Sequence, residues 1–189
     1  MKTQWNNWTK LIPWLMAVLL SSAGMFLGYE LGSGTARLLG GEPGIWARMG
    51  KGFVWGGVIT GLQWPVIRSV GVRPLLLMVT GAVSFAVGYP LGQTMQSIFI
   101  HYWNLHLTGY WLAVATFGLS LGVPQSLIFR RHLKRSGLWI LLSLTGWILT
   151  GLVWLSGAKG GFEYGIVTGL GLVWLIHAQR KVLPDSFHS

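Results

Sequence analysis

The sequence predicts an all-α integral membrane protein with six transmembrane helices, and three observations support this prediction. Of its 189 residues, 52% are hydrophobic and only 10% are charged, whereas a soluble domain has roughly 25% charged residues. Its 28 glycines and 12 tryptophans are typical of closely packed membrane helices with aromatic residues at the interface. Several apolar runs approach or exceed the roughly 20 residues that a span requires. We therefore expect a single membrane domain over residues 1–189.

The apolar runs define six spans in chain order. The second and the last are short, but Arg68 and Arg180 at their ends have side chains long enough to reach the headgroups. Pro65, Pro90 and Pro124 fall inside apolar runs, where neighbouring helices can satisfy the freed backbone groups, so they predict kinks and not ends. The predicted spans are Leu11–Gly32, Gly52–Ile67, Pro74–Ile98, Leu107–Phe129, Gly137–Ser156 and Tyr164–Ala178.

The basic residues predict the orientation of these spans. Ten lie on the side of the two termini, and four lie on the other side. Because cytoplasmic loops are enriched in Lys and Arg, we expect both termini in the cytoplasm. A cleaved secretory signal over the first 23 residues is the competing interpretation, although the apolar run continues to Leu31. The ten are Lys2, Lys10, Arg68, Arg73, Arg130, Arg131, Lys134, Arg135, Arg180 and Lys181; the four are Arg37, Arg48, Lys51 and Lys159.

A pattern of glycine, glutamine and arginine recurs in the even-numbered spans. Gly57–Arg68 and Gly118–Arg130 both contain G-x3-G, then Gln, then Arg five residues later. The segment Gly165–Gly171 repeats the opening, with Gly in place of Gln. Self-similarity of this kind is the signature of a repeat architecture.

The odd-numbered spans recur as well. Leu27–Gly32 aligns with Val87–Gly92, and a weaker third copy is Gly146–Gly151. The sequence thus predicts three helical hairpins, over residues 11–68, 74–131 and 137–182. Because each unit holds two spans, successive units keep the same orientation, as in parallel-repeat transporters.

The repeated motif has two interpretations. In the first, the motif serves packing alone, because glycines four residues apart flatten a helix face and a Gln across a helix interface adds a hydrogen bond. Alternatively, Gln63 and Gln125 face a polar cavity that holds a ligand or a proton path. Glu30 is the acid placed well inside an apolar run, and it is either an interfacial carboxylate paired with Arg37, Arg48 or Lys51, or a proton- or cation-binding group.

The motif resembles that of a loose group of uncharacterised multi-pass bacterial membrane proteins, frequent in cyanobacteria. Their hallmark is a repeated G-x3-G-x2-Q-W-x-V-x-R block followed by a Trp-rich span. Here the block is Gly57–Arg68, with a degenerate copy over Gly118–Arg131 and a following span that contains Trp139 and Trp147. This chain departs from the pattern at Ser126 and at the missing third Gln. The resemblance implies no particular activity, but it implies a location in a bacterial inner or thylakoid membrane.

Catalytic and metal-binding constellations are not predicted. The chain has four acids and no cysteine, which leaves no thiolate ligands. A serine on the fourth span, Ser120, and a histidine on the sixth, His177, resemble the arrangement found in rhomboid intramembrane proteases. However, Ser120 lies about 15 Å deep and His177 about 4–5 Å deep, which is too far apart for the hydrogen bond that a Ser–His pair needs. His101 and His106 lack a third ligand nearby and suit an aromatic interfacial turn. No cofactor is implied.

Two polar regions outside the spans have predicted roles. The longest predicted loop, Ser33–Lys51, suits a short surface helix, a docking surface or a lid. The basic residues after the second and fourth spans suit anionic lipid headgroups, and a nucleic-acid partner is not expected. These predicted membrane-surface residues are Arg68, Arg130, Arg131, Lys134 and Arg135.

Two functions from different classes fit these observations. The first is a non-catalytic scaffold, assembly or accessory subunit of a membrane complex, because the sequence is devoted to packing and other membrane subunits would be its partners. The alternative is a small-molecule binding or transport subunit, because the size and span number resemble the substrate-capture components of vitamin transporters. In that case Gln63, Gln125 and Glu30 would line the site.

Overall fold

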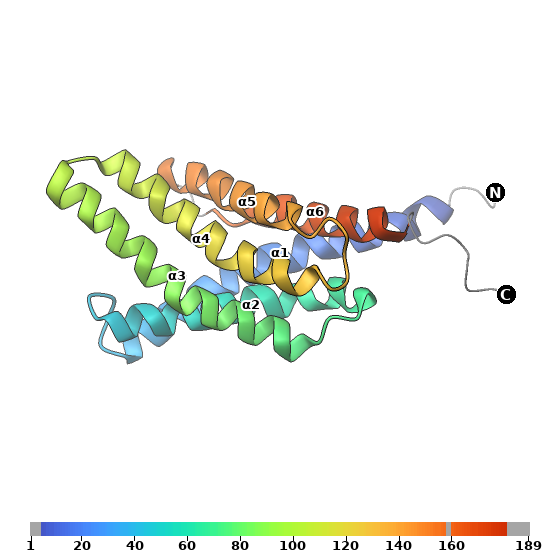
Figure 1. Ribbon diagram of the computed structural model, residues 1–189, viewed down its shortest axis with the longest axis horizontal. Coiled ribbons are helices and arrows are strands. Elements are labelled where there is room, and N and C mark those ends of the chain that lie inside the picture. The colour runs from blue at the N-terminus through green and yellow to red at the C-terminus, as the bar shows by residue number, and fades with distance from the viewer. Residues whose placement is uncertain (1–4, 158–159, 181–189) are drawn as a thin grey trace.

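A computed structural model describes residues 5–157 and 160–180, and these residues form α-helices joined by short turns, without strands (Figure 1). The predicted all-α class is thereby confirmed for the part of the chain described. Lys2, Lys159 and Lys181 of the charge count lie outside it. The helices are α1 (Trp5–Leu38), α2 (Ile45–Ile67), α3 (Pro74–Trp103), α4 (His106–Phe129), α5 (Leu138–Leu155) and α6 (Phe162–Arg180), with a 3-10 turn at Arg68–Val70.

Four of these helices are long and apolar enough to cross a membrane, in the segments Leu11–Leu38, Pro74–Trp103, His106–Phe129 and Leu138–Leu155. They belong to α1, α3, α4 and α5, which makes this a multi-pass membrane protein. Helix α2 is 23 residues long but carries Arg48 and Lys51 near its start, and the apolar part of α6 is the shorter segment Phe162–Ala178.

The first turn is much shorter than the sequence indicated. The predicted loop Ser33–Lys51 is wrong, because α1 continues to Leu38 and α2 begins at Ile45. Hydropathy marks the thickness of the membrane and not the end of a helix, so both helices extend past the predicted spans. The turn itself is made by Gly40 and Gly41, whose φ angles of 94° and 90° suit glycine. Helices α2, α3 and α4 continue through Pro65, Pro90 and Pro124, as predicted.

The six helices pack as a closed ring in chain order. Each helix makes its main contacts with the helices before and after it, and α6 packs against α1. Figure 1 shows the elongated bundle, in which the first turn of α1 and the last turn of α6 lie at the same end. Ring closure therefore encloses the core of the bundle.

Glycines let the helices approach closely. A Cβ atom added to Gly118 would lie 2.8 Å from the Leu144 Cα atom of α5, and one on Gly169 would lie 2.7 Å from the backbone of Ala17 in α1. On α2, however, the closest approach is made by Gly52 and Gly56. A Cβ on either would lie 2.3 Å from a carbonyl oxygen of α3, whereas one on Gly57 would make an ordinary 3.4 Å contact.

The surface of the bundle is apolar along its helices, and polar side chains lie inside. On α3, Val79, Val83, Val87 and Leu91 are all exposed at a spacing of four residues, which places them on one outer face. Inside, Thr60, Gln63, Gln125, Ser143, Thr150 and Thr168 are fully buried. An apolar exterior over a partly polar interior is the arrangement that lipid favours.

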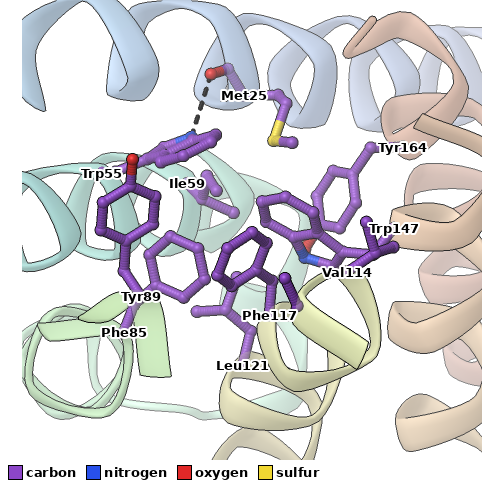
Figure 2. Close-up of a cluster of buried hydrophobic side chains, with 11 residues drawn as sticks. Met25, Trp55, Ile59, Phe85, Tyr89, Val114, Phe117, Leu121, Trp147 and Tyr164 are labelled. Atoms are coloured by element: carbon purple, nitrogen blue, oxygen red, sulfur yellow. Dashed lines mark hydrogen bonds between the residues drawn. The ribbon is translucent and has the colours of Figure 1, made fainter. Parts of the chain in front are cut away.

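Two buried clusters fill the ring. The central cluster takes side chains from all six helices and is rich in aromatic rings packed edge to face (Figure 2). A second cluster fills the end at which α2 and α4 finish and includes Ile67, Phe129 and Trp139. The central cluster consists of Met25, Trp55, Ile59, Phe85, Tyr89, Ala113, Val114, Phe117, Leu121, Trp147 and Tyr164.

Candidate functional site

A cavity of about 570 Å³ opens at the end of the bundle where α1 joins α2 and α5 joins α6. Its volume lies within the range of small-molecule sites. The lining comes from α1 to α5 and from the two turns, and it combines aromatic and charged side chains. It includes Met25, Phe26, Tyr29, Glu30, Glu42, Lys51, Trp55, Tyr89, Gln93, Phe117, Trp154, Gly157 and Gly160.

The floor of the cavity is the upper face of the central cluster. Trp55 and Tyr89 meet with ring centroids 5.8 Å apart, and Tyr89 stacks on Phe117 at 5.4 Å. The indole nitrogen of Trp55 donates to the Met25 carbonyl oxygen at 3.1 Å, as Figure 2 shows. This bond ties the ring of Trp55 on α2 to the backbone of α1.

An ion pair between a buried ammonium and a half-exposed carboxylate forms one wall of the cavity. The ammonium of Lys51 pairs with the carboxylate of Glu42, and the side chains of these two residues are 3% and 51% exposed. The same ammonium lies 4.4 Å from the ring centroid of Tyr29 and 5.2 Å from that of Tyr89. Cations over aromatic faces within about 6 Å are attracted by the ring quadrupole. The short first turn brings Glu42 within reach of α2, which is why this pair forms.

Glu30 lines the same cavity, but its predicted ion pairs are wrong. Lys51 pairs with Glu42, and the guanidinium of Arg48 donates to the backbone carbonyl of Glu42 at 2.8 Å. Arg37, the third predicted partner, makes no side-chain pair with it. Within the described residues Glu30 therefore has no ion-pair partner, and its exposed carboxylate faces the cavity.

The two repeated glutamines are fully buried and do not line this cavity. Gln125 accepts a 2.6 Å hydrogen bond from the indole nitrogen of Trp139 on α5. The amide of Gln63 makes no hydrogen bond within the described residues, although the hydroxyl of Tyr164 lies near it. The structure thus separates the three predicted binding residues, with Glu30 at the cavity and the glutamines deeper in the bundle.

This difference between the glutamines gives a first prediction. Replacing Gln125 with Leu is expected to lower the free energy of unfolding by about 1–3 kcal/mol, because the buried N–H of Trp139 loses its acceptor. Gln63→Leu, the matched control, removes no hydrogen bond and is expected to change stability less. Unfolding of both variants in detergent micelles measures the difference. A larger loss in Gln63→Leu would show that its amide has the more important partner.

The other residues considered from the sequence each have contacts of their own. Ser120 on α4 packs against Gly88 of α3, and its hydroxyl donates to the Phe117 carbonyl at 2.9 Å. His177 on α6 stacks on Trp14 of α1 with centroids 5.7 Å apart. His106 contacts Asn104 at 3.1 Å, and His101 contacts the Ser97 carbonyl. In the described ranges no three metal-binding side chains come together.

The basic residues predicted to lie at the membrane surface gather at the opposite end of the bundle. They follow the ends of α2 and α4 and precede α5. Arg68, Arg130, Arg131, Lys134 and Arg135 are all exposed, and Lys134 takes part in an additional interaction.

Sequence reasoning missed the cavity's ion pair and its tyrosines as site residues. The signal for the tyrosines was present, because Tyr29 and Tyr89 follow the matched glycines Gly28 and Gly88. The signal for Lys51 was weak, since a basic residue just before an apolar run normally marks only the membrane surface.

Comparison with known proteins finds no matching protein family, no matching curated protein and no matching solved structure. The assignment of a function therefore rests on the geometry of this chain alone.

Proposed function

We propose that this protein is a membrane-embedded binding subunit for a small organic cation with an aromatic or apolar body. The observation that carries the proposal is the cavity of about 570 Å³, in which the carboxylate of Glu30 has no ion-pair partner among the described residues and faces aromatic walls. A pocket with apolar surfaces and few polar groups suits a small ligand.

The charge of the lining favours a cation. Among the described residues of the lining, two carboxylates, Glu30 and Glu42, and one ammonium, Lys51, give a net charge of −1. Two of the chain's four acids lie here. Lys51 already occupies the space between Tyr29 and Tyr89, so an incoming ammonium would pair with Glu30 and use the remaining aromatic surface of Trp154 and Phe26.

The closed floor favours binding over free passage. Below the cavity, the central cluster draws buried side chains from every helix of the ring, and its rings pack against one another. A ligand would thus enter and leave by the same opening unless the helices move apart. This suits a capture subunit that works with a partner in the membrane.

We also propose that all six helices cross the membrane as three related hairpins. The buried residues of α2 include Lys51, Thr60 and Gln63, so its polar groups face the interior and its lipid face stays apolar. The matched glycines support the repeat, because Gly28, Gly88 and Gly146 each face the next helix along the chain. Under this proposal the basic end of the bundle is cytoplasmic and the cavity opens on the other side.

The test uses the purified full chain in detergent with defined probes. We expect benzyltrimethylammonium to bind more tightly than tetramethylammonium, and the neutral benzyl alcohol to bind least. Glu30→Gln is expected to weaken binding at least about tenfold, or about 1.4 kcal/mol, in isothermal titration. Glu163→Gln is the matched control, because that carboxylate lies at the same end and accepts from the Gly161 N–H without lining the cavity.

Equal affinity for the charged and neutral aromatic probes would contradict the proposal, as would equal loss in the two variants. If none of the probes binds and the protein is recovered from native membrane in a stable complex, the scaffold or assembly function is favoured instead.

A further inference from the structure

A second cavity, of about 580 Å³, lies at the opposite end of the bundle from the first. It is formed where the turn before α3 meets the end of α4, so it sits at the seam between these two adjacent helices. Gly71, with a φ of 81°, turns the chain there and lies beside the His132 ring. The lining residues are Gly71, Val72, Arg73, Leu76, Leu127, Ile128, Arg131 and His132.

The polar half of this cavity is basic, and the described residues supply no counterion for it. Arg73 and Arg131 are exposed, and neither forms an ion pair in the part of the chain that the structure describes. The described acids are Glu30, Glu42 and Glu163, which belong to α1, the first turn and α6 at the opposite end. The two arginines therefore form a site of positive charge beside His132, and an external anion would neutralise it.

The other half of the cavity is apolar, which indicates the kind of anion. Leu76 and Leu127 are 48% and 61% exposed, and they lie one turn further into α3 and α4 than the arginines. A free phosphate would leave these side chains unused, whereas a phospholipid would place its acyl chains along them. Basic pockets between membrane helices are known to suit anionic headgroups of this kind.

We infer that an anionic phospholipid binds in this cavity, with its phosphate between Arg73, Arg131 and His132 and its acyl chains along Leu76 and Leu127. The site is distinct from the cation cavity and does not depend on its function. It is also more specific than a general attraction of the basic end to the membrane, because Arg130 and Arg135 lie outside it.

The experiment compares lipid binding by two variants of equal charge. Arg73→Gln/Arg131→Gln removes the two arginines of the cavity, and Arg130→Gln/Arg135→Gln removes two exposed arginines nearby. The full chain in detergent is titrated with phosphatidylglycerol or phosphatidylcholine, and bound lipid is measured by native mass spectrometry. We expect the cavity variant to bind phosphatidylglycerol about 30-fold more weakly than the wild type, or about 2 kcal/mol, and the control variant to bind nearly as the wild type does.

Melting temperatures in phosphatidylcholine establish that both variants are folded. Equal loss of phosphatidylglycerol in the two variants would overturn the inference in favour of a diffuse surface attraction. Equal binding of the two lipids by the wild type would also overturn it.

A third arm adds inorganic phosphate at millimolar concentration, and displacement of the lipid by phosphate alone would show an anion site without a lipid component. If Leu76→Gln/Leu127→Gln also weakens phosphatidylglycerol binding, the acyl-chain part of the site is supported, and no effect would overturn that part.

Discussion

Replacing Glu42 with Gln is expected to lower the free energy of unfolding by about 3 kcal/mol, although Glu42 lies in a turn and is half exposed. The reason is its partner, because the side chain of Lys51 is only 3% exposed and a buried ammonium without a counterion is costly. The rings of Tyr29 and Tyr89 beside it offset part of this cost but supply no negative charge.

Replacing Lys51 is expected to lower the free energy of unfolding less than replacing Glu42 does. Lys51→Met leaves Glu42 half in water, where its carboxylate can be hydrated, and the methionine side chain fits the aromatic surroundings, so we expect a loss below about 1 kcal/mol. The double variant should resemble Lys51→Met, since no buried charge remains. Unfolding of the three variants in detergent micelles measures this order. A greater loss in Lys51→Met than in Glu42→Gln would show that the ammonium stabilises the fold chiefly through the tyrosines.

Two neighbouring glycines on α2 are expected to respond very differently to the same substitution. Gly56→Ala would place a Cβ atom 2.3 Å from the Gly81 carbonyl oxygen and 2.6 Å from the Phe85 Cβ atom. Neither atom can move without shifting α3, so we expect a loss of about 1–3 kcal/mol from overpacking. Gly57→Ala meets only Ala82 at 3.4 Å, and the gain in helix propensity should leave it neutral or slightly stabilising.

The comparison is direct because both variants add one methyl group to the same turn of the same helix. Melting temperatures of the two variants in detergent measure it. A larger loss for Gly57→Ala would mean that α2 is rotated by about a quarter of a turn from the orientation described, and the assignment of Lys51 to the cavity would fail with it.

Sequence patterns predict the class of this protein well because helices that contact lipid need apolar side chains, and hydropathy measures this property directly. Each apolar run that predicted a span coincides with a helix to within one residue at its ends or lies inside it, and Pro65, Pro90 and Pro124 interrupt none of these helices. The rotation of each helix is harder to predict. Gly52 and Gly56 make the close approach to α3, and Gly57 and Gly61 make looser contacts, yet both pairs have the same spacing and only the neighbouring helix distinguishes them.

The candidate site, like the fold, could be predicted only in part from the sequence. Glu30 could be selected from the sequence because an acid inside an apolar run is costly. The surroundings of Glu30 could not be predicted, because the ion pair that forms near it depends on where the turn between α1 and α2 ends. The predicted loop Ser33–Lys51 offered Glu30 three basic partners, but extension of α1 and α2 placed Glu42 beside Lys51 instead. Which residues pair across a turn depends on the backbone geometry of the turn, and this geometry cannot be inferred from composition or residue spacing.

Closure of the ring by α6 has a consequence for assembly in the membrane. Gly165 and Gly169 of α6 pack against Ser22 and Ala17 of α1, so the last contact joins segments that are far apart along the chain. Until α6 arrives, the buried hydroxyl of Ser22 and the inner face of α1 remain open to lipid. Contacts of high sequence separation form slowly. Packing of α6 on α1 therefore closes the ring and completes the core, and we expect this contact to form late in folding.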